Sequence, residues 1–412
     1  MPSGRGVTVL VAGIALWLVA RLLGSPTMHI VAAGLVALPF AAALFARWSH
    51  QRFEVHRRLS DVRVRPGQRL SVELEVHNRG SLATSFLLVE DRVPGALGRP
   101  ARLVLTGIPA RNHQRVAYAL VAQRRGRYVL GPLAIDVSDP FALTRLRIGF
   151  DLRDELVVTP EVEDLRAPDG SLVGFGTGPS RAKYLFRTGE EFYTMRPFVE
   201  GDDLRRIHWP SVARTGQLMI RQDESSRRSA ALILLDTRAA ALGEAHRPAF
   251  EKAVSVAASI GMHLARSGYV LRLATAQLPP EATSEDAFLD ALATVSHASM
   301  RSLHPVLSRI RTAAAGDTTL VLVSAPPLPA ELGALIRSGA GFGPKLAALV
   351  YPVEPATLPP ERRAQLEGRA SQARLSLSRA GWDVLVLGPQ ARLADVWLSG
   401  RTRLPAASGP SA

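Results

Sequence analysis

Two long apolar runs lie near the start of the chain, at residues 7–20, continuing to 23, and at residues 30–46. Each approaches the roughly 20 residues that a helix needs to cross a bilayer. The segment between them contains Gly24, Ser25 and Pro26, which favour a tight turn. The pattern therefore predicts a two-helix transmembrane hairpin over residues 1–50.

Positive charge flanks this hairpin on both outer sides. Arg5 precedes the first run, and Arg47, Arg52, Arg57 and Arg58 follow the second. Because cytoplasmic flanks of membrane helices are rich in Lys and Arg, we expect a multi-pass protein of the inner or plasma membrane with the bulk of the chain in the cytoplasm. A cleaved signal peptide is the alternative, but no small-residue cleavage site separates the two runs.

Apolar and polar residues alternate from residue 70 onward, which is the pattern of a half-buried strand. One face would carry Leu70, Val72, Leu74 and Val76, and the other Ser71, Glu73 and Glu75. Further short strands are predicted in residues 85–91, 101–108, 114–122, 126–139 and 154–160. Such a series indicates an all-β, antiparallel sandwich of immunoglobulin-like type over residues 51–160. Segments 78–80 and 124–126 are interpreted as turns, and no catalytic set is visible in this module.

The pattern changes in residues 227–400 to continuous apolar strands that alternate with helical stretches. The strands are predicted in residues 230–237, 269–276, 318–325, 345–352 and 382–389, and the segment 250–267 has the spacing of an amphipathic helix. Continuous apolar runs are typical of parallel strands covered on both faces, so we expect an open, doubly wound α/β domain. Residues 401–412 are expected to form a disordered tail.

The amino-acid composition excludes several kinds of functional site. The 412 residues include no cysteine, which excludes disulfides, a thiolate nucleophile and Cys-ligated metal sites. The formal net charge of +14 comes almost wholly from Arg, since Lys occurs only at positions 183, 252 and 345. We interpret this bias as genome composition; attraction to anionic lipids and nucleic-acid binding are the alternatives. No basic cluster interleaved with aromatic residues stands out, so no nucleic-acid partner is expected.

Asp236 directly follows a predicted strand, at the carboxyl end where open α/β sheets bind ligands. The loop that begins there resembles the first loop of von Willebrand factor A domains, whose metal site uses the pattern D-x-S-x-S. Arg238 and Ala240 stand where the serine hydroxyls would bind the ion, and an arginine brings a positive charge instead of an oxygen. The resemblance implies a degenerate A-type domain that keeps the architecture, with no metal and no cofactor. Glycines in residues 174–178 are interpreted as a flexible link.

Residues 161–226 crowd acidic residues, arginines, a His-Trp pair and a proline into a linker between the two modules. A catalytic interpretation would use Glu190, Glu191, Asp202, Asp203, His208 and Ser211 as acids, bases, ligands or nucleophile. No triad or HExxH pattern is present, so we expect no catalytic residue. A metal-dependent hydrolase that uses Asp202, Asp203 and His208 stays as the alternative.

A structural interpretation makes the same linker a clasp between the modules. Gly201 would permit a tight turn, Asp202 or Asp203 would cap a short helix over residues 204–209, and Pro210 would end that helix. This interpretation assigns a local role to each turn-forming or capping residue.

The remaining side chains of the clasp would pair with opposite charges or become buried. The carboxylates would bind the guanidinium groups of Arg196, Arg205 and Arg214. Ile207 and Trp209 would pack into the interior, and residues 216–221 would continue as a strand. Because Arg, Trp and Tyr dominate binding hot spots, the clasp can also be interpreted as a recognition surface.

Residues 189–218 read G-E-E-F-x-x-M-R-P-F-x-x-G-D-D-x-R-R-I-H-W-P-S-x-A-R-T-G-x-L, and this long pattern resembles the signature of the bacterial domain-of-unknown-function family 58. Residues 124–132 and 138–145 are similar to that family's β region, and the hairpin and the A-type region suit its layout. The signature positions, to which the resemblance assigns no role, are Glu191, Arg196, Gly201, Asp202, Asp203, Arg205, His208, Trp209, Arg214 and Gly216.

Members of that family are typically encoded beside MoxR-type AAA+ ATPases. The resemblance therefore implies a membrane-anchored interaction or adaptor protein that works with such an ATPase in the assembly or maturation of protein complexes at the cell envelope. No enzymatic residue carries over from the family. A basic organiser of lipid surfaces is a third alternative.

Overall fold

The computed structural model describes residues 3–49, 53–81, 83, 84, 86–138, 143, 145–165, 193–198, 207–223 and 229–399. The chain divides into two compact units. The first comprises Met1–Glu161 with Leu289–Val295, and the second comprises Val162–Phe288 with Ser296–Ala412. The predicted glycine link at 174–178 and tail at 401–412 lie outside the described residues.

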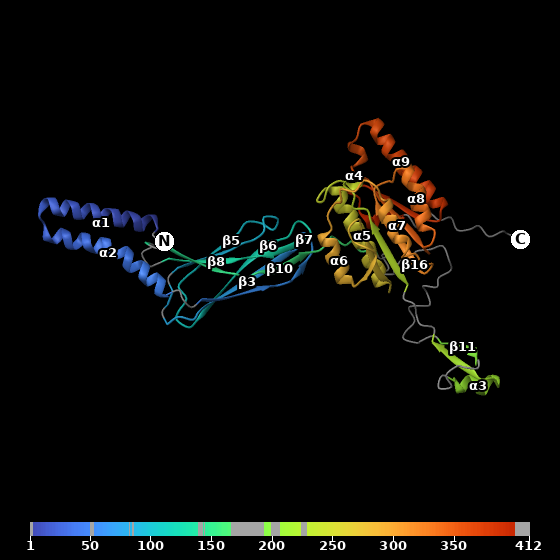
Figure 1. Ribbon diagram of the computed structural model, residues 1–412, viewed down its shortest axis with the longest axis horizontal. Helices are drawn as coiled ribbons and strands as arrows, with labels where there is room; N and C mark the ends of the chain where they lie inside the picture. The colour runs from blue at the N-terminus through green and yellow to red at the C-terminus, as the bar shows by residue number, and fades with distance from the viewer. Residues whose placement is uncertain are drawn as a thin grey trace. The chain divides into compact units, whose positions relative to one another are not determined.

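Two helices near the amino terminus, α1 (Gly4–Leu23) and α2 (Pro26–Ser49), confirm the predicted helical elements (Figure 1). The Ser3 hydroxyl accepts a hydrogen bond from the Gly6 amide and so caps the start of α1. Gly24 ends α1 in the left-handed conformation, with φ 62°. Both helices are long and apolar enough to cross a membrane.

Small residues bring α1 and α2 together. A Cβ atom built on Gly13 would lie 2.9 Å from Cγ2 of Val36, so only glycine permits this close approach. Where burial is described in the hairpin, the buried alanines are Ala20, Ala32 and Ala42. Bulky apolar side chains are exposed instead, among them Leu22, Ile30, Phe40 and Leu44. Helices that pack in lipid typically have small residues where they contact each other and bulky apolar side chains on their outer surface.

Ten strands follow in the described part of the first unit, and they form three sheets (Figure 1). Their bounds are β1 Phe53–Leu59, β2 Arg63–Val64, β3 Arg69–Asn78, β4 Leu87–Asp91, β5 Ala101–Leu105, β6 His113–Val121, β7 Gly126–Leu130, β8 Leu133–Ser138, β9 Arg145–Phe150 and β10 Asp154–Val158. The sheet orders are β1-β3-β6, β2-β10-β7 and β5-β4-β8-β9. Strand pairs are antiparallel except β2 with β10. A β-rich module of mainly antiparallel sheets is therefore confirmed.

The predicted alternation along β3 is confirmed, because Leu70, Val72, Leu74 and Val76 all lie in one buried core. The single strand predicted at residues 126–139 is instead two strands, β7 and β8, with the cis bond between Gly131 and Pro132 separating them. Strands β1, β2 and β9 were not predicted. In β1 and β9, arginines occupy much of the strand and obscure the apolar alternation.

The β module encloses an ion pair. The Arg57 side chain, on β1, is fully buried and donates hydrogen bonds to both carboxylate oxygens of Asp91, at 2.5 and 3.0 Å. Arg57 also donates to Asp154 at 2.8 Å, and the Tyr118 hydroxyl donates to Asp91 at 2.6 Å. Burial and the Asp91 carboxylate raise the pKa of Tyr118. Arg57, one of the arginines that follow the second apolar run, is therefore a core residue of β1.

The second unit is built on a six-stranded sheet with the order β15-β14-β13-β16-β17-β18. The strands are β13 Ala230–Leu235, β14 Val270–Ala274, β15 Glu281–Thr283, β16 Thr318–Ser324, β17 Lys345–Val350 and β18 Asp383–Leu387. Neighbouring strands are parallel except β14 with β15. The predicted parallel strands are confirmed. The short edge strand β15 was not predicted, because its three residues carry no apolar run.

Helices alternate with these strands along the chain (Figure 1). They are α4 Ala239–Leu242, α5 Pro248–Arg266, α6 Glu285–Thr294, α7 His304–Arg311, α8 Pro329–Gly339, a 3-10 turn Pro355–Thr357, α9 Pro360–Arg379 and α10 Leu393–Ser399. Leu232 and Leu234 of β13 share a buried cluster with residues of α7, α8 and α9. Helix α5 packs against β13, β14, β16 and β17 outside that cluster, so helices cover both faces of the sheet.

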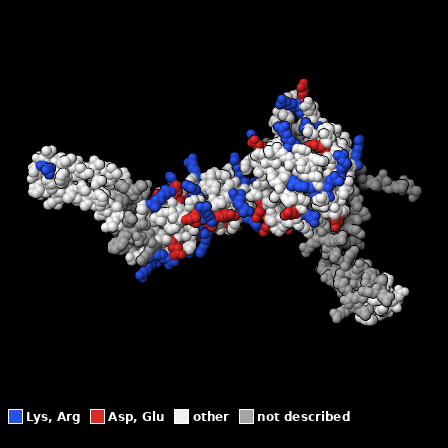
Figure 2. All heavy atoms as spheres, viewed as in Figure 1, with Lys and Arg blue, Asp and Glu red and all other residues white. Residues whose placement is uncertain are grey.

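Charged side chains are scattered over the β and α/β units. On the face that Figure 2 shows, Lys and Arg are interspersed with Asp and Glu. The surface of the α1–α2 hairpin is almost free of charge in the same view (Figure 2). The positive net charge is therefore distributed over this face and does not form a single basic patch there.

Candidate functional site

The signature segment folds as a strand pair that carries a short helix. Strand β11 (Tyr193–Pro197) pairs antiparallel with β12 (Met219–Asp223) over its full length. Helix α3 (Trp209–Thr215) lies between them in the chain. The His208 amide donates to the Met219 carbonyl at 2.9 Å, which ties the start of the helix to β12. The strand predicted for residues 216–221 is present as β12, which begins three residues later and ends two residues later.

The helix of the signature begins later than expected. We expected it over residues 204–209, ended by Pro210; instead Ile207 and His208 lie outside the helix and Pro210 lies in the first turn of α3. Proline is well tolerated there, because the first amides of a helix have no partner within it. The predicted helix range and the predicted role of Pro210 are therefore wrong.

Helix α3 is open to solvent. Trp209 exposes 66% of its surface, so its expected burial is wrong. No residue of α3 is buried. Gly216 ends the helix in the left-handed conformation, with φ 69°, and its amide donates to the Val212 carbonyl. The exposed indole at the start of the helix offers a large apolar surface and an N–H donor to a binding partner.

His208 and Ser211 contact each other at the start of α3. The His208 Nδ1 atom lies 2.9 Å from the Ser211 hydroxyl oxygen, and which of the two donates depends on the histidine tautomer. This distance is within reach for a base and a nucleophile. It is also the spacing at which a residue before a helix bonds the third residue of the first turn. The contact by itself therefore fits both a chemical and a structural role.

Several signature residues lie outside the described part of the chain: Glu191, Gly201, Asp202, Asp203 and Arg205. Arg196 is described only in its backbone, which pairs with Ile220. Arg214 is exposed in the last turn of α3. Both expectations, the pairing of these arginines with the aspartates and the capping of a helix by Asp202 or Asp203, involve aspartates that lie outside the described residues.

The second candidate position lies at the carboxyl end of β13. Asp236 follows the last residue of the strand and is 1% exposed, and its amide donates to the Val323 carbonyl at 2.8 Å. The Arg238 guanidinium binds this carboxylate through two hydrogen bonds, from Nε to Oδ1 at 2.9 Å and from a terminal nitrogen to Oδ2 at 2.8 Å. One side chain thus occupies both carboxylate oxygens.

Arg238 is held by other groups as well. Its second terminal nitrogen donates to the Glu331 carboxylate, from the first turn of α8, and to the Arg301 carbonyl. Burial lowers the pKa of Arg238, but the hydrogen bonds and charges of Asp236 and Glu331 outweigh it, and the net pKa is raised. The guanidinium therefore stays charged, and a divalent ion would have to displace it to reach Asp236. Sequence reasoning missed Glu331, because only the fold brings α8 to this loop.

Sequence reasoning also missed a group of side chains in the β module. Among the described residues, Glu75, His77 and His113 form a group that could hold a metal ion. The alternation of polar residues along β3 already places Glu75 and His77 on one face. His113 joins them only through the pairing of β3 with β6.

Comparison with known proteins agrees with the signature. Residues 194–318 match the model of a family described as "Protein of unknown function DUF58". The uncharacterized protein YeaD of Bacillus subtilis (strain 168) is 25% identical over 247 residues, which are 56% of this chain and 58% of YeaD. The match therefore spans less than two thirds of that relative.

Solved structures resemble part of the chain at low scores. The CARDB domain of a Pyrococcus furiosus protein matches 26% of this chain and 92% of its own, with 12% identity and a TM-score of 0.21. The C-terminal domain of wzt matches 28% of this chain and 78% of its own, with 13% identity and a TM-score of 0.21. At these scores the likeness supports no functional argument.

The family match covers α3, β12 and the first strands of the α/β unit, including Asp236. It overlaps the residues from which the resemblance was drawn, 189–218, in all but their first five positions. Residues 194–318 of this chain are therefore similar to the DUF58 family, in the region where the signature predicted the resemblance.

Proposed function

We propose that this protein is a membrane-anchored interaction or adaptor protein that works with a MoxR-type AAA+ ATPase in the assembly or maturation of protein complexes at the cell envelope. The observation that carries the proposal is the exposure of Trp209 within the DUF58 signature. Tryptophan is among the residues that dominate protein-binding hot spots, and covering its apolar surface releases free energy. The proposed activity is binding, without catalysis.

The helical hairpin supports the membrane part of the proposal. Its helices bury small residues and expose bulky apolar ones, which suits lipid. Arg5 in the first turn of α1, Arg47 in the last turn of α2 and Arg52 after it favour a cytoplasmic position for both ends of the hairpin. These features support our proposal that the protein lies in the inner or plasma membrane, with the bulk of the chain in the cytoplasm.

The strand order supports an A-type assignment for the α/β unit. Numbered along the chain, the strands lie in the doubly wound order 3-2-1-4-5-6, with the third antiparallel at the edge. In such sheets the end of the first strand is a ligand position, and Asp236 lies there with Arg238 bound to it. We propose the exposed part of this degenerate A-type loop, at Ala240, as a second protein contact, and the β module as an immunoglobulin-like support.

Quantitative co-purification of the full-length protein from its own membranes tests the adaptor function. Trp209→Ala is compared with wild type and with Leu375→Ala, a control that truncates an exposed apolar residue of α9. We expect wild type and the control to retain a AAA+ ATPase. Recovery with Trp209→Ala should fall about tenfold or more, because truncating a hot spot costs at least about 2 kcal/mol of binding.

Two outcomes contradict parts of this proposal. If all three proteins are shown to be folded by thermal melts and recover equal amounts of the ATPase, an essential contact at Trp209 is excluded. The loop at Asp236 would then be the next candidate contact. Wild-type preparations that retain no AAA+ ATPase would contradict the adaptor function itself.

The alternative is a metal-dependent hydrolase that uses Asp202, Asp203 and His208. The 2.9 Å contact between His208 and Ser211 is the observation in its favour. Turnover in a broad hydrolase screen that disappears in His208→Ala would support it. So would a stoichiometric divalent ion that is lost in Asp203→Asn without unfolding but kept in His77→Ala.

A further inference from the structure

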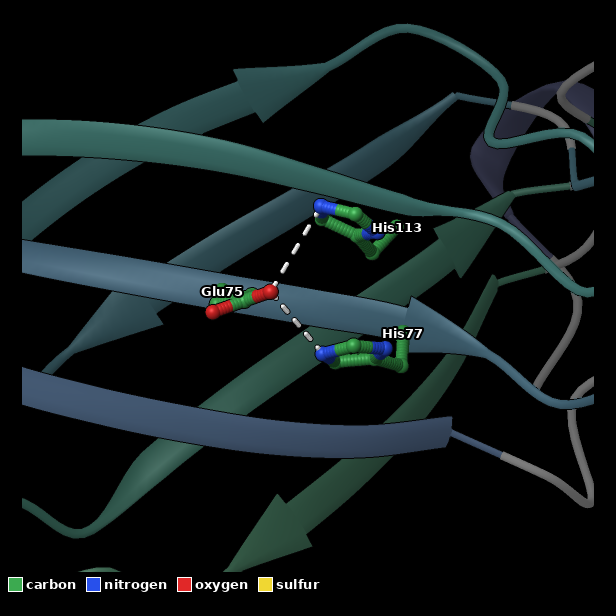
Figure 3. Close-up of side chains that lie close together, drawn as sticks. All are labelled: Glu75, His77 and His113. Carbon is green, nitrogen blue, oxygen red and sulfur yellow. Dashed lines mark ion pairs between the residues drawn. The ribbon is translucent and has the colours of Figure 1, made fainter.

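Two histidines and a glutamate meet on the face of the β1-β3-β6 sheet that lies away from the core. His77 of β3 and His113 of β6 are directly opposite each other in the antiparallel pair. Glu75 lies two residues before His77 and therefore on the same face of β3. The two imidazole rings stack with centroids 5.0 Å apart, and both point Nε2 toward one carboxylate oxygen of Glu75 (Figure 3).

The distances within this group are those of ligands to a tetrahedral ion. The Glu75 Oε1 atom lies 3.1 Å from His77 Nε2 and 3.5 Å from His113 Nε2, and all three ligand atoms lie within 4.8 Å of one another. Zinc binds nitrogen and oxygen ligands at about 2.0–2.2 Å, so two ligands of a tetrahedral zinc ion lie about 3.4 Å apart. Small side-chain rotations therefore bring the three atoms into the first coordination sphere.

The surroundings position the ligands before any ion arrives. Glu75 is buried although it lies on the polar face, and a buried carboxylate needs a cationic partner. His56, opposite Glu75 on β1, packs its ring edge-on to His77 with centroids 5.6 Å apart and is itself bound to Glu54 at 3.1 Å. The His77 ring is thus held between two imidazoles, while the partly exposed His113 leaves an approach from solvent.

One cation of the protein already contacts the group. A terminal nitrogen of Arg115 lies 3.4 Å from Glu75 Oε1, and its Nε lies 3.8 Å from Glu73 Oε1. The Arg115 side chain is more than half exposed, so it is free to move fully to Glu73 when an ion binds Glu75. Because Arg115 competes with a bound ion for the Glu75 carboxylate, we expect that its removal raises the affinity of the site for a cation.

We propose that Glu75, His77 and His113 form a binding site for one divalent cation of the zinc type. Imidazole nitrogen and carboxylate oxygen are ordinary zinc ligands, and a set of two histidines and one carboxylate leaves the fourth position for water or for a ligand from another molecule. The bound ion would link β3 to β6 across their hydrogen-bonded pair. This site lies outside residues 194–318 and does not depend on the proposed adaptor function.

Calorimetric titration of Zn²⁺ into full-length protein in detergent tests the site, with protein treated with a chelator and purified without a histidine tag. We expect one Zn²⁺ per chain in wild type. Binding should weaken at least about tenfold in His77→Ala and in His113→Ala. His304→Ala is the matched control, because it removes an exposed histidine of α7 and should bind as wild type does.

Arg115→Gln keeps all three ligands and should bind Zn²⁺ more tightly than wild type. Co²⁺ provides a spectroscopic readout, since a four-coordinate ion gives strong visible absorption that His77→Ala should lack. If a histidine variant fails to fold, the Zn²⁺ affinities of Arg115→Gln and wild type still test the proposal. The proposal is overturned if wild type binds no stoichiometric Zn²⁺, if folded histidine variants bind as wild type does, or if Arg115→Gln leaves the affinity unchanged.

Discussion

The Arg57 guanidinium, enclosed in the β module, is bound by Asp91 through two hydrogen bonds and by Asp154 through a third. Arg57→Ala would leave the Asp91 carboxylate buried without its main partner. Breaking such a pair typically costs about 3–5 kcal/mol, so we expect a large loss of unfolding free energy, measured by denaturant titration in detergent.

Arg153→Ala is the control for this change, because Arg153 pairs with Asp151 on the surface and both side chains are mostly exposed. Its unfolding midpoint should stay that of wild type, since exposed ion pairs contribute little. Equal losses in the two variants would mean that the Arg57 pair is not a core interaction.

Trp209 and Trp397 differ in environment, and this difference makes a second prediction. Trp209 is 66% exposed on α3, whereas Trp397 is 2% exposed on α10. Trp209→Ala should leave the melting temperature unchanged, while Trp397→Ala should lower it strongly, because truncating a buried aromatic costs about 3–5 kcal/mol. Circular dichroism melts of both variants check this. A clear drop in the melting temperature of Trp209→Ala would instead indicate that Trp209 has a structural role.

At the scale of elements, Glu163 joins two helices within the second unit, to which it also belongs. Its carboxylate binds the Lys252 ammonium of α5 at 2.7 Å and accepts a hydrogen bond from the Ala394 amide of α10 at 3.0 Å. Burial raises the pKa of Glu163, but the hydrogen bonds from Lys252 and from the backbone of α10 outweigh it and lower the pKa below its ordinary value.

This lowered pKa predicts how stability depends on pH. The contribution of Glu163 is fully present above the ordinary pKa of glutamate, about 4.3, and is lost as the pH falls through the lower folded pKa. The difference in unfolding free energy between wild type and Glu163→Gln should therefore be largest at neutral pH and shrink below about pH 4. Glu361→Gln, on the exposed first turn of α9, should show no such trend. A difference that stays constant down to pH 3 would contradict this prediction.

The elements that were predicted differ from those that were missed in how clearly their own sequence indicates a strand or a helix. Strand β13 reads as a continuous apolar run, so its position could be predicted without any knowledge of its neighbours. Strand β15 is three residues long and polar, and only its pairing with β14 makes it a strand. Helix α3 was misplaced because Pro210 ends helices in most positions but is accepted in the first turn.

At the scale of the whole molecule, the predicted topology places the turn between α1 and α2 on the side of the membrane opposite to the β module. The chain contains no cysteine, so a single introduced cysteine reports its own position. Ser25→Cys, in that turn, should react with a membrane-impermeant thiol reagent on intact cells. Ser60→Cys, after β1, should react only once the cells are lysed. The reverse pattern would invert the topology.

The sequence by itself determined the features that depend on neighbours in the chain. These are the two apolar helices, the alternation along β3, the parallel strands of the α/β unit and the DUF58 signature. Apolar run length and side-chain period are local properties, and a motif is a local string, so each can be recognised before the chain is folded.

Only the tertiary structure decided which distant side chains meet. Arg57 finds Asp91, Arg238 finds Glu331, and His113 joins Glu75 through strand register and helix packing. No local pattern encodes these pairs, because their members are far apart in the chain. For the pairs between strands, a shift of one residue in register would also turn a side chain to the opposite face. The exposure of Trp209 likewise follows from where α3 begins, which depends on the pairing of its flanking residues with β12.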